Sequence, residues 1–112
     1  MQLNHEKLEV YQMAIQFLAI AFQIIKTIPS GYGFLTDQLK RASLSIPLNI
    51  AEGNGKFTKD DQAKFYKIAR GSANECSAIL DALTIMELLT PDSASKGKEL
   101  LYRIVCMLYK MF

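Results

Sequence analysis

Residues 45–75, SIPLNIAEGNGKFTKDDQAKFYKIARGSANE, contain the signals that decide the fold. Ile46 and Ile50 are one helical turn apart, and Gly53-Asn54-Gly55 predicts the left-handed residues that end a helix. Thr58 can then cap a second helix, whose first turn contains two aspartates that favour its positive end. The stretch therefore predicts two helices joined by a short glycine turn.

The rest of the chain shows the same organisation. Asn4 is a good N-cap for a first helix, Pro29-Ser30-Gly31 ends that helix, and Thr90-Pro91-Asp92 breaks the third. No segment alternates apolar and polar residues as a half-buried strand does. We expect one all-α domain over residues 1–112, an up-down-up-down antiparallel four-helix bundle. Its helices should span about 5–27, 34–54, 58–89 and 94–112.

The first helix has two apolar rows. One row, which we assign to the core, alternates steps of three and four residues: Leu8, Tyr11, Ile15, Leu18, Phe22 and Ile25. The other row lies on nearly the opposite side: Met13, Phe17, Ile20 and Ile24. Exposed apolar patches of this size mark protein interfaces, so the second row predicts self-association. The alternative is that neighbouring helices cover both rows.

Composition argues against several classes of protein. The formal net charge is only +2, and Cys76, Cys106 and His5 are too scattered for a metal site. The N-terminus lacks the apolar segment of a signal peptide. The longest apolar run, residues 13–25, is shorter than the ~20 residues that a membrane span needs. We expect a soluble cytoplasmic protein with no cofactor, no metal and no membrane partner.

Several polar residues lie on helix sides that we expect to be buried, where they reduce stability, and they have two interpretations. Glu52 and Glu75 could form an acid–base pair, or they could belong to a polar network that fixes helix register. The GNGK sequence at 53–56 lacks the features of a phosphate-binding loop, and no nucleophile–histidine pair is present. We therefore predict no catalytic residue and no enzyme activity. The predicted structural network consists of Asn49, Glu52, Ser72 and Glu75, in which Glu75 needs a donor from Asn49, Ser72, Arg41 or Arg70.

Gly71 precedes Ser72 in the middle of the third helix, where glycine costs ~1 kcal/mol relative to alanine. We expect it to let another helix approach closely.

Basic residues concentrate at the start of the third helix. They are Lys56, Lys59, Lys64, Lys67 and Arg70, with only two aspartates among them. On a monomer such residues usually form only a solvated face. Repeated around a ring of identical subunits, they would provide phosphate contacts, which predicts RNA or DNA binding.

The quoted stretch resembles the signature of the 23S rRNA-intervening-sequence proteins, and the similarity extends from about Leu8 through the third helix. The matching positions are Asn49, Ala51-Glu52-Gly53, Phe65, Ala69, Gly71-Ser72 and Glu75. Lys56 stands where that family often has arginine. The resemblance implies a small bacterial four-helix bundle that assembles as a ring-like homopentamer. The chain is also similar to the accessory variability determinant of diversity-generating retroelements, which partners a reverse transcriptase and nucleic acid.

Three functional hypotheses follow. The first is a non-enzymatic homo-oligomer that binds nucleic acid, with structured RNA as the expected ligand, through a repeated basic rim. The second is an accessory scaffold for a reverse transcriptase, in which protein contacts outweigh charge. The third is a purely structural protein that assembles with itself.

Overall fold

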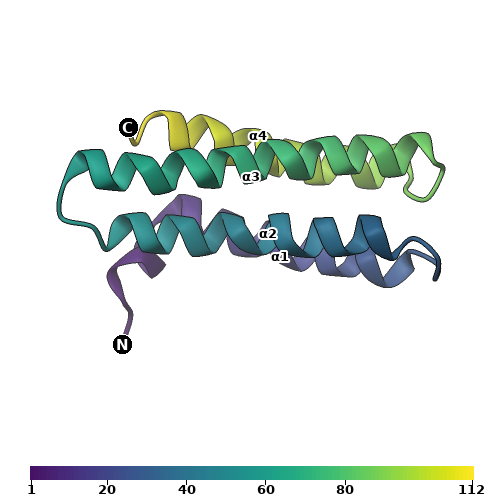
Figure 1. Cartoon of the computed structure of the whole chain (residues 1–112), viewed down its shortest axis with the longest axis horizontal. Coiled ribbons are helices and arrows are strands. Elements are labelled where there is room, and N and C mark those ends of the chain that lie inside the picture. The colour runs from purple at the N-terminus through teal and green to yellow at the C-terminus, as the bar shows by residue number, and fades with distance from the viewer.

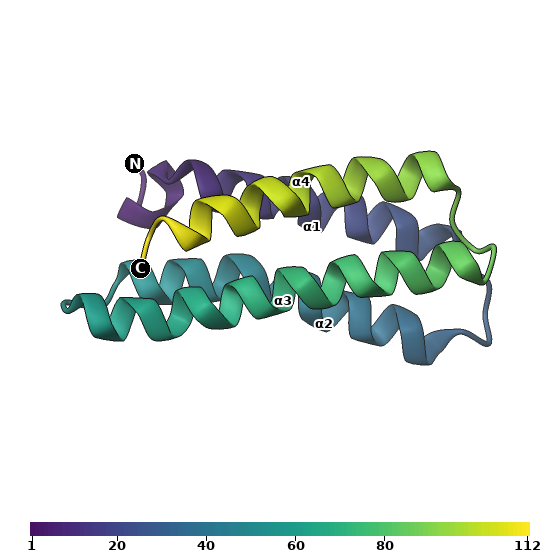
Figure 2. The ribbon, with the colours of Figure 1, turned by 90° about the horizontal axis from the view of Figure 1, so that it is seen from above.

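The computed structural model describes all 112 residues, which form four α-helices and no strand. The helical elements are η1 (Asn4–Lys7), α1 (Glu9–Thr27), α2 (Gly33–Asn54), α3 (Lys59–Ile85) and α4 (Pro91–Tyr109). Successive α-helices run antiparallel, and both termini lie at the end with the α2–α3 connection (Figure 1). Helices α1 and α3 each pack against both α2 and α4 (Figure 2). The predicted antiparallel four-helix bundle is confirmed.

Side-chain caps start α3 and α4. The Thr58 hydroxyl accepts a hydrogen bond from the Asp61 amide at 3.1 Å, as the sequence predicts. Thr90 accepts one from the Ser93 amide at 3.2 Å, so α4 begins directly after it, at Pro91, and the predicted start near residue 94 was too late. Proline suits this first position because its missing N–H would have no partner within the helix there. Threonine therefore sets both helix starts through its side chain.

The first helix begins later than predicted. Asn4 does not cap it, because the Asn4 side chain donates to the Asn54 side chain at 3.2 Å instead. A short 3₁₀ turn, η1, follows, and Leu8 has extended backbone (φ −73°, ψ 128°) that separates η1 from α1. The N-terminal turn is therefore linked directly to the end of α2.

Helix α3 ends four residues earlier than predicted, at Ile85 rather than Leu89. Glu87 adopts a left-handed backbone with φ 62°. The Glu87 amide donates to the Thr84 carbonyl at 3.0 Å, and the Leu88 amide donates to the Leu83 carbonyl at 2.9 Å. This pair of bonds is a Schellman motif, which normally has glycine at the left-handed position. Because glutamate occupies that position here, no residue type marks this helix end.

The glycines at the end of α2 act differently from the prediction. Gly55 has a right-handed backbone (φ −79°), so the expected left-handed termination is wrong. Gly53 instead allows α2 and α3 to approach closely. A Cβ at Gly53 would lie 2.8 Å from Cε1 of Tyr66 and 3.1 Å from Cβ of Phe65. The glycine requirement here is one of helix packing rather than of backbone conformation.

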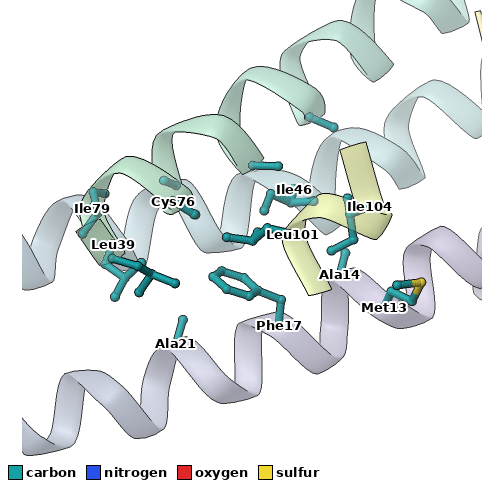
Figure 3. Packing of buried hydrophobic residues seen from close by; sticks show 14 of the residues in the cluster. Met13, Ala14, Phe17, Ala21, Leu39, Ile46, Cys76, Ile79, Leu101 and Ile104 are labelled. Carbon is teal, nitrogen blue, oxygen red and sulfur yellow. The ribbon is translucent and has the colours of Figure 1, made fainter. Parts of the chain in front are cut away.

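The core is built mainly on the apolar row of α1 that was predicted to face outward. Met13, Phe17 and Ile24 are buried, and Figure 3 shows Met13 and Phe17 extending from α1 into the core. Ile20 is half-buried and packs against this cluster. In the row assigned to the core, Ile15 and Phe22 are each 41% exposed, whereas three other members are partly buried and pack against the core: Leu8, Tyr11 and Ile25. The proposed interface row Met13, Phe17, Ile20 and Ile24 is therefore a core row, and the assignment was wrong.

Small residues explain this reversal. Ala14 and Ala21 are fully buried on the same side of α1 as Phe17, and they allow the neighbouring helices to approach that side. The spacing of large apolar residues does not distinguish the two rows, because both follow the helical period. The alanines, which a count of large side chains ignores, mark the side that packs.

Helix α1 is long and apolar enough to cross a membrane by length and composition alone, with a mean hydropathy of 1.2. The core helix of a bundle meets the same criterion. The core row of α1 packs against α2 and α4, whereas Ile15 and Phe22 of the same helix stay partly exposed.

Candidate nucleic-acid interface

The five basic residues at the start of α3 fall into two groups by their ion pairs. Lys56 pairs with Glu52 at 3.3 Å, and Lys64 pairs with Asp61 at 3.7 Å. The only other ion pairs in the protein join Arg41 to Glu75 and Lys98 to Asp81. The remaining three basic residues therefore have no carboxylate partner: Lys59, Lys67 and Arg70. Their positive charge is the part of the predicted patch that the protein itself leaves uncompensated.

Lys56 lies on a different side of the molecule from Arg70. Its ammonium is 5.2 Å from the ring centroid of Phe65 and pairs with Glu52 of α2. Phe65 and Arg70 are five residues apart on α3, which corresponds to about 140° around the helix. The structure therefore places Lys56 on the α2-facing side of α3 and separates it from the unpaired cations.

Arg70 and Lys67 face α4 and rest on aromatic rings. The Arg70 guanidinium carbon is 4.3 Å from the centroid of the Tyr109 ring and 5.2 Å from that of Phe112. The Lys67 ammonium is 5.7 Å from the Phe112 centroid. A cation over a ring face is attracted by the ring quadrupole, and a guanidinium can also stack flat on it. The rings thus hold these two cations in place without neutralising their charge.

Lys59 extends the same surface toward the end of the bundle. It lines a shallow depression together with Lys110, Phe112 and the acidic Asp60, at the point where the start of α3 meets the end of the chain. We call the whole group the α3–α4 basic face: Lys59, Lys67, Arg70, Tyr109, Lys110 and Phe112. Fixed positive charge beside exposed rings suits an anionic ligand that also has flat groups to stack.

Sequence reasoning missed the α4 half of this face. Tyr109, Lys110 and Phe112 lie at the end of the fourth helix, whose apolar spacing indicates only core residues. A signal was nevertheless present in the register of the antiparallel pair. The contacts Arg70–Tyr109, Lys67–Phe112 and Asp81–Lys98 all follow one register between α3 and α4. Placing the two predicted helices side by side from their shared loop would have brought the two clusters together.

The predicted polar network is built around Ser45, which the prediction did not include. The Ser72 hydroxyl of α3 donates to the Ser45 hydroxyl at 2.8 Å. The Asn49 amide donates to the same hydroxyl at 2.9 Å and to the Ser45 carbonyl at 2.8 Å. Glu52 is not part of this cluster, because it pairs with Lys56 at the end of α2. The cluster joins α2 to α3 on the side that faces away from α4.

Glu75 finds its donor in Arg41, at 3.3 Å across the α2–α3 contact. Its carboxylate also acts on the neighbouring thiol. Burial, assisted by the negative charge of Glu75, raises the pKa of Cys76 to about 12. A thiol with so high a pKa stays protonated at neutral pH and is a poor nucleophile.

Gly71 lies in open space on the outer side of α3. A Cβ added at this glycine would have no atom of a neighbouring helix within 4 Å. The expected close approach of another helix of the bundle at Gly71 was therefore wrong, since this glycine is exposed.

Comparison with solved structures supports the fold. The chain is similar to the crystal structure of a protein of unknown function from the S23 ribosomal protein family of Bacteroides thetaiotaomicron. The TM-score is 0.84 at 21% sequence identity, and the match covers 91% of this chain and 96% of that one. At this identity the likeness shows a shared fold. No curated protein matches the chain.

Comparison with protein families covers nearly the whole molecule. The match spans residues 6–110, which include all four α-helices and most of the α3–α4 basic face. It also includes the Ser45 cluster and the glycine at which α2 and α3 approach each other. The chain therefore belongs to the 23S rRNA-intervening sequence protein family.

Proposed function

We propose that this protein is a non-enzymatic, homo-oligomeric helical bundle that binds nucleic acid, with structured RNA as the expected ligand. One observation carries the proposal. Lys59, Lys67 and Arg70 have no carboxylate partner, whereas the other two basic residues of the predicted patch are paired. Several unpaired cations on one face favour nucleic-acid binding, because each phosphate that they neutralise releases its bound counterions. The binding surface is accordingly the α3–α4 basic face rather than all five residues of the predicted patch.

Self-association rests on a different surface. Two rows of large apolar side chains remain exposed on the outer sides of α1 and α2. Ile15 and Phe22 of α1 are each 41% exposed, while Leu44 and Leu48 of α2 are 45% and 58% exposed. Within each row the residues are one or two helical turns apart and so share a side of their helix. This outer apolar surface replaces the buried row as the proposed contact between copies, and a ring of five copies is implied by the family resemblance.

The same apolar surface also favours a second candidate, an accessory scaffold that binds another protein such as a reverse transcriptase. Exposed apolar rows suit a protein partner as well as a second copy. The two candidates differ in what the isolated protein does. A scaffold whose outer apolar surface is reserved for a partner would be monomeric alone, whereas a homo-oligomer assembles without help.

RNA binding is tested by fluorescence anisotropy with a labelled RNA hairpin at several salt concentrations. Affinity should fall with salt, with a log–log slope of about −0.7 to −0.9 for each phosphate neutralised. A variant with Lys59, Lys67 and Arg70 all changed to Glu should lose roughly a hundredfold in affinity and have a shallower slope. The matched control changes three exposed lysines elsewhere, Lys7, Lys26 and Lys40, to Glu.

This control separates a local surface from overall charge, because both variants change the net charge equally. Equal losses in the two variants would contradict a binding surface on α3 and α4. Absence of salt-dependent RNA binding in the unmodified protein would refute the nucleic-acid proposal as a whole.

Self-association is tested by light scattering together with circular dichroism. Phe22→Glu and Leu48→Glu should lower the mass of the assembly while keeping the helical spectrum, since both residues are exposed on one subunit. Phe17→Glu should unfold the protein instead, because it places a charge at a fully buried position. A monomeric mass for the unmodified protein would refute the homo-oligomer and favour the scaffold.

A further inference from the structure

The α3–α4 basic face contains more aromatic surface than charge neutralisation requires. Tyr109 is 58% exposed and Phe112 is 39% exposed. Tyr102 lies two helical turns before Tyr109, on the same side of α4, and is 69% exposed. Three rings that are exposed to this extent contribute little to the hydrophobic core. Core packing therefore does not explain why they lie beside the cations.

Tyr109 and Phe112 form a stacked pair of rings at the end of α4. Their ring centroids are 6.2 Å apart, and the ring planes differ by 29°. The half-buried guanidinium of Arg70 lies over both rings and restricts their motion. Lys67 approaches Phe112 from the preceding turn of α3. The Arg70 guanidinium therefore covers part of the ring faces, and the rest of Tyr109 and Phe112 stays exposed.

Tyr102 extends this aromatic surface along α4. It borders a depression whose other walls include Asn74 and Ser77 of α3. Seven residues separate it from Tyr109, which corresponds to about 10 Å along the helix. That distance corresponds to about three nucleotides at the ~3.4 Å rise of a stacked strand. The surface is therefore long enough for a short run of unpaired nucleotides.

We propose that the protein recognises unpaired nucleotides, whose bases stack on Tyr109 and Tyr102 while Arg70 and Lys67 contact the phosphates. This inference rests on the proposed function and specifies its ligand as single-stranded nucleic acid or the unpaired loop of a structured RNA. Base–aromatic stacking tolerates any base, since every base has a flat face. A continuous duplex hides those faces between its base pairs and offers only its phosphates to this surface.

The test compares an oligouridine RNA of about 20 nucleotides with a blunt RNA duplex of similar length. Tyr109→Leu and Tyr102→Leu remove a ring but keep apolar bulk. Each should weaken oligouridine binding roughly tenfold and leave duplex binding unchanged. The salt dependence of Tyr102→Leu should keep its slope, because the Tyr102 ring holds none of the cations that contact phosphate. Tyr109→Phe should restore binding, and Phe34→Leu, which alters an exposed ring on α2, is the matched control.

Intrinsic fluorescence provides a second readout. The protein contains five tyrosines and no tryptophan, so tyrosine emission is not masked. Oligouridine should quench part of this emission, and the quenching should diminish in Tyr109→Leu. Oligothymidine should bind within a few-fold of oligouridine, because stacking does not read the 2′-hydroxyl. A DNA affinity weaker by orders of magnitude would overturn stacking as the mode of recognition.

Other outcomes separate this inference from the proposed function. If oligouridine binds with clear salt dependence but both leucine variants bind as tightly as the unmodified protein, stacking is refuted and the basic face remains. Duplex binding as tight as oligouridine binding would also refute it. If Tyr109→Leu lowers the mass of the assembly, the rings serve a subunit contact instead. If no nucleic acid binds at all, the proposed function itself fails.

Discussion

The two sides of α3 differ in how they use polar residues. On the side that faces α2, the Ser45 cluster and the Arg41–Glu75 pair satisfy the polar groups within the bundle. On the side that faces α4, Arg70 and Lys67 lie on aromatic rings with no carboxylate partner. Polar groups that satisfy one another fix the register of two helices, whereas cations held on rings remain available to an outside anion. One flank of α3 therefore fixes the packing of α2 and α3, and the other flank carries the proposed binding surface.

The largest predicted effect is a loss of stability at high pH through Cys76. Its pKa rises from 9.0 to about 12 on folding because the thiol is buried beside Glu75. The unfolded chain therefore releases this proton first as the pH rises, and the folded state loses stability between about pH 9 and pH 12. The free energy of unfolding should fall by on the order of 4 kcal/mol across that interval. Urea unfolding at stepped pH values measures the fall.

Cys76→Ala is the reference for this titration, because it removes the thiol while keeping the other groups that ionise at high pH. The variant should show a visibly flatter decline above pH 9. The same slope in both proteins would mean that Cys76 is not the group responsible.

The second prediction compares two glycines that contact opposite flanks of α3, Gly53 of α2 and Gly97 of α4. Gly53→Ala should destabilise the bundle by about 1–3 kcal/mol, because its Cβ would meet the buried Tyr66 ring and the Cβ of Phe65. Gly97→Ala should cost less, because the nearest atom is the terminal Cδ1 of Leu80 at 2.9 Å, which can move. Thermal and urea unfolding report both values. A larger cost at Gly97 would reverse the conclusion that the α2 contact is the less adaptable of the two.

Local signals made the fold predictable from the sequence. The Thr58 cap, Pro91 after Thr90 and the apolar spacing in α2 each act within one or two helical turns, so they can be read without knowing the neighbours. The end of α3 could not be read in this way, because Glu87 occupies a position where glycine is expected. The local rules are reliable wherever the residue type fits the backbone conformation.

The packing of the helices against one another was less predictable than the helices themselves. Both rows of α1 follow the helical period, and only packing against α2, α3 and α4 decides that Phe17 is inside and Phe22 outside. Likewise, only part of the candidate site could be predicted from the sequence. The cations of α3 stand close together in the sequence, but Tyr109 and Phe112 join them only through the antiparallel register. The spacing of Glu52 and Lys56 indicates that these two can pair, but the sequence does not show which of the other cations have carboxylate partners.

A smaller effect is expected at Gly71, which lies on the outer side of α3 between the two flanks. Gly71→Ala should stabilise an isolated subunit by roughly 0.5–1 kcal/mol, because alanine favours the helix interior and its Cβ has open space. Thermal unfolding measures the gain, and light scattering shows whether assembly is retained. Loss of assembly in this variant would show that another copy packs closely on Gly71.

The smallest effect is expected from the ion pair on the α2-facing flank. The side chains of Arg41 and Glu75 are 69% and 39% exposed, so water and salt screen their attraction. A double-mutant cycle with Arg41→Ala and Glu75→Gln should give a coupling energy of about 0.2–1 kcal/mol, which decreases at high salt. RNA affinity should stay unchanged in Arg41→Ala, since this cation is already paired. A loss of affinity comparable to that of Arg70→Ala would show that the α2-facing flank also binds, and the two sides of α3 would no longer differ in role.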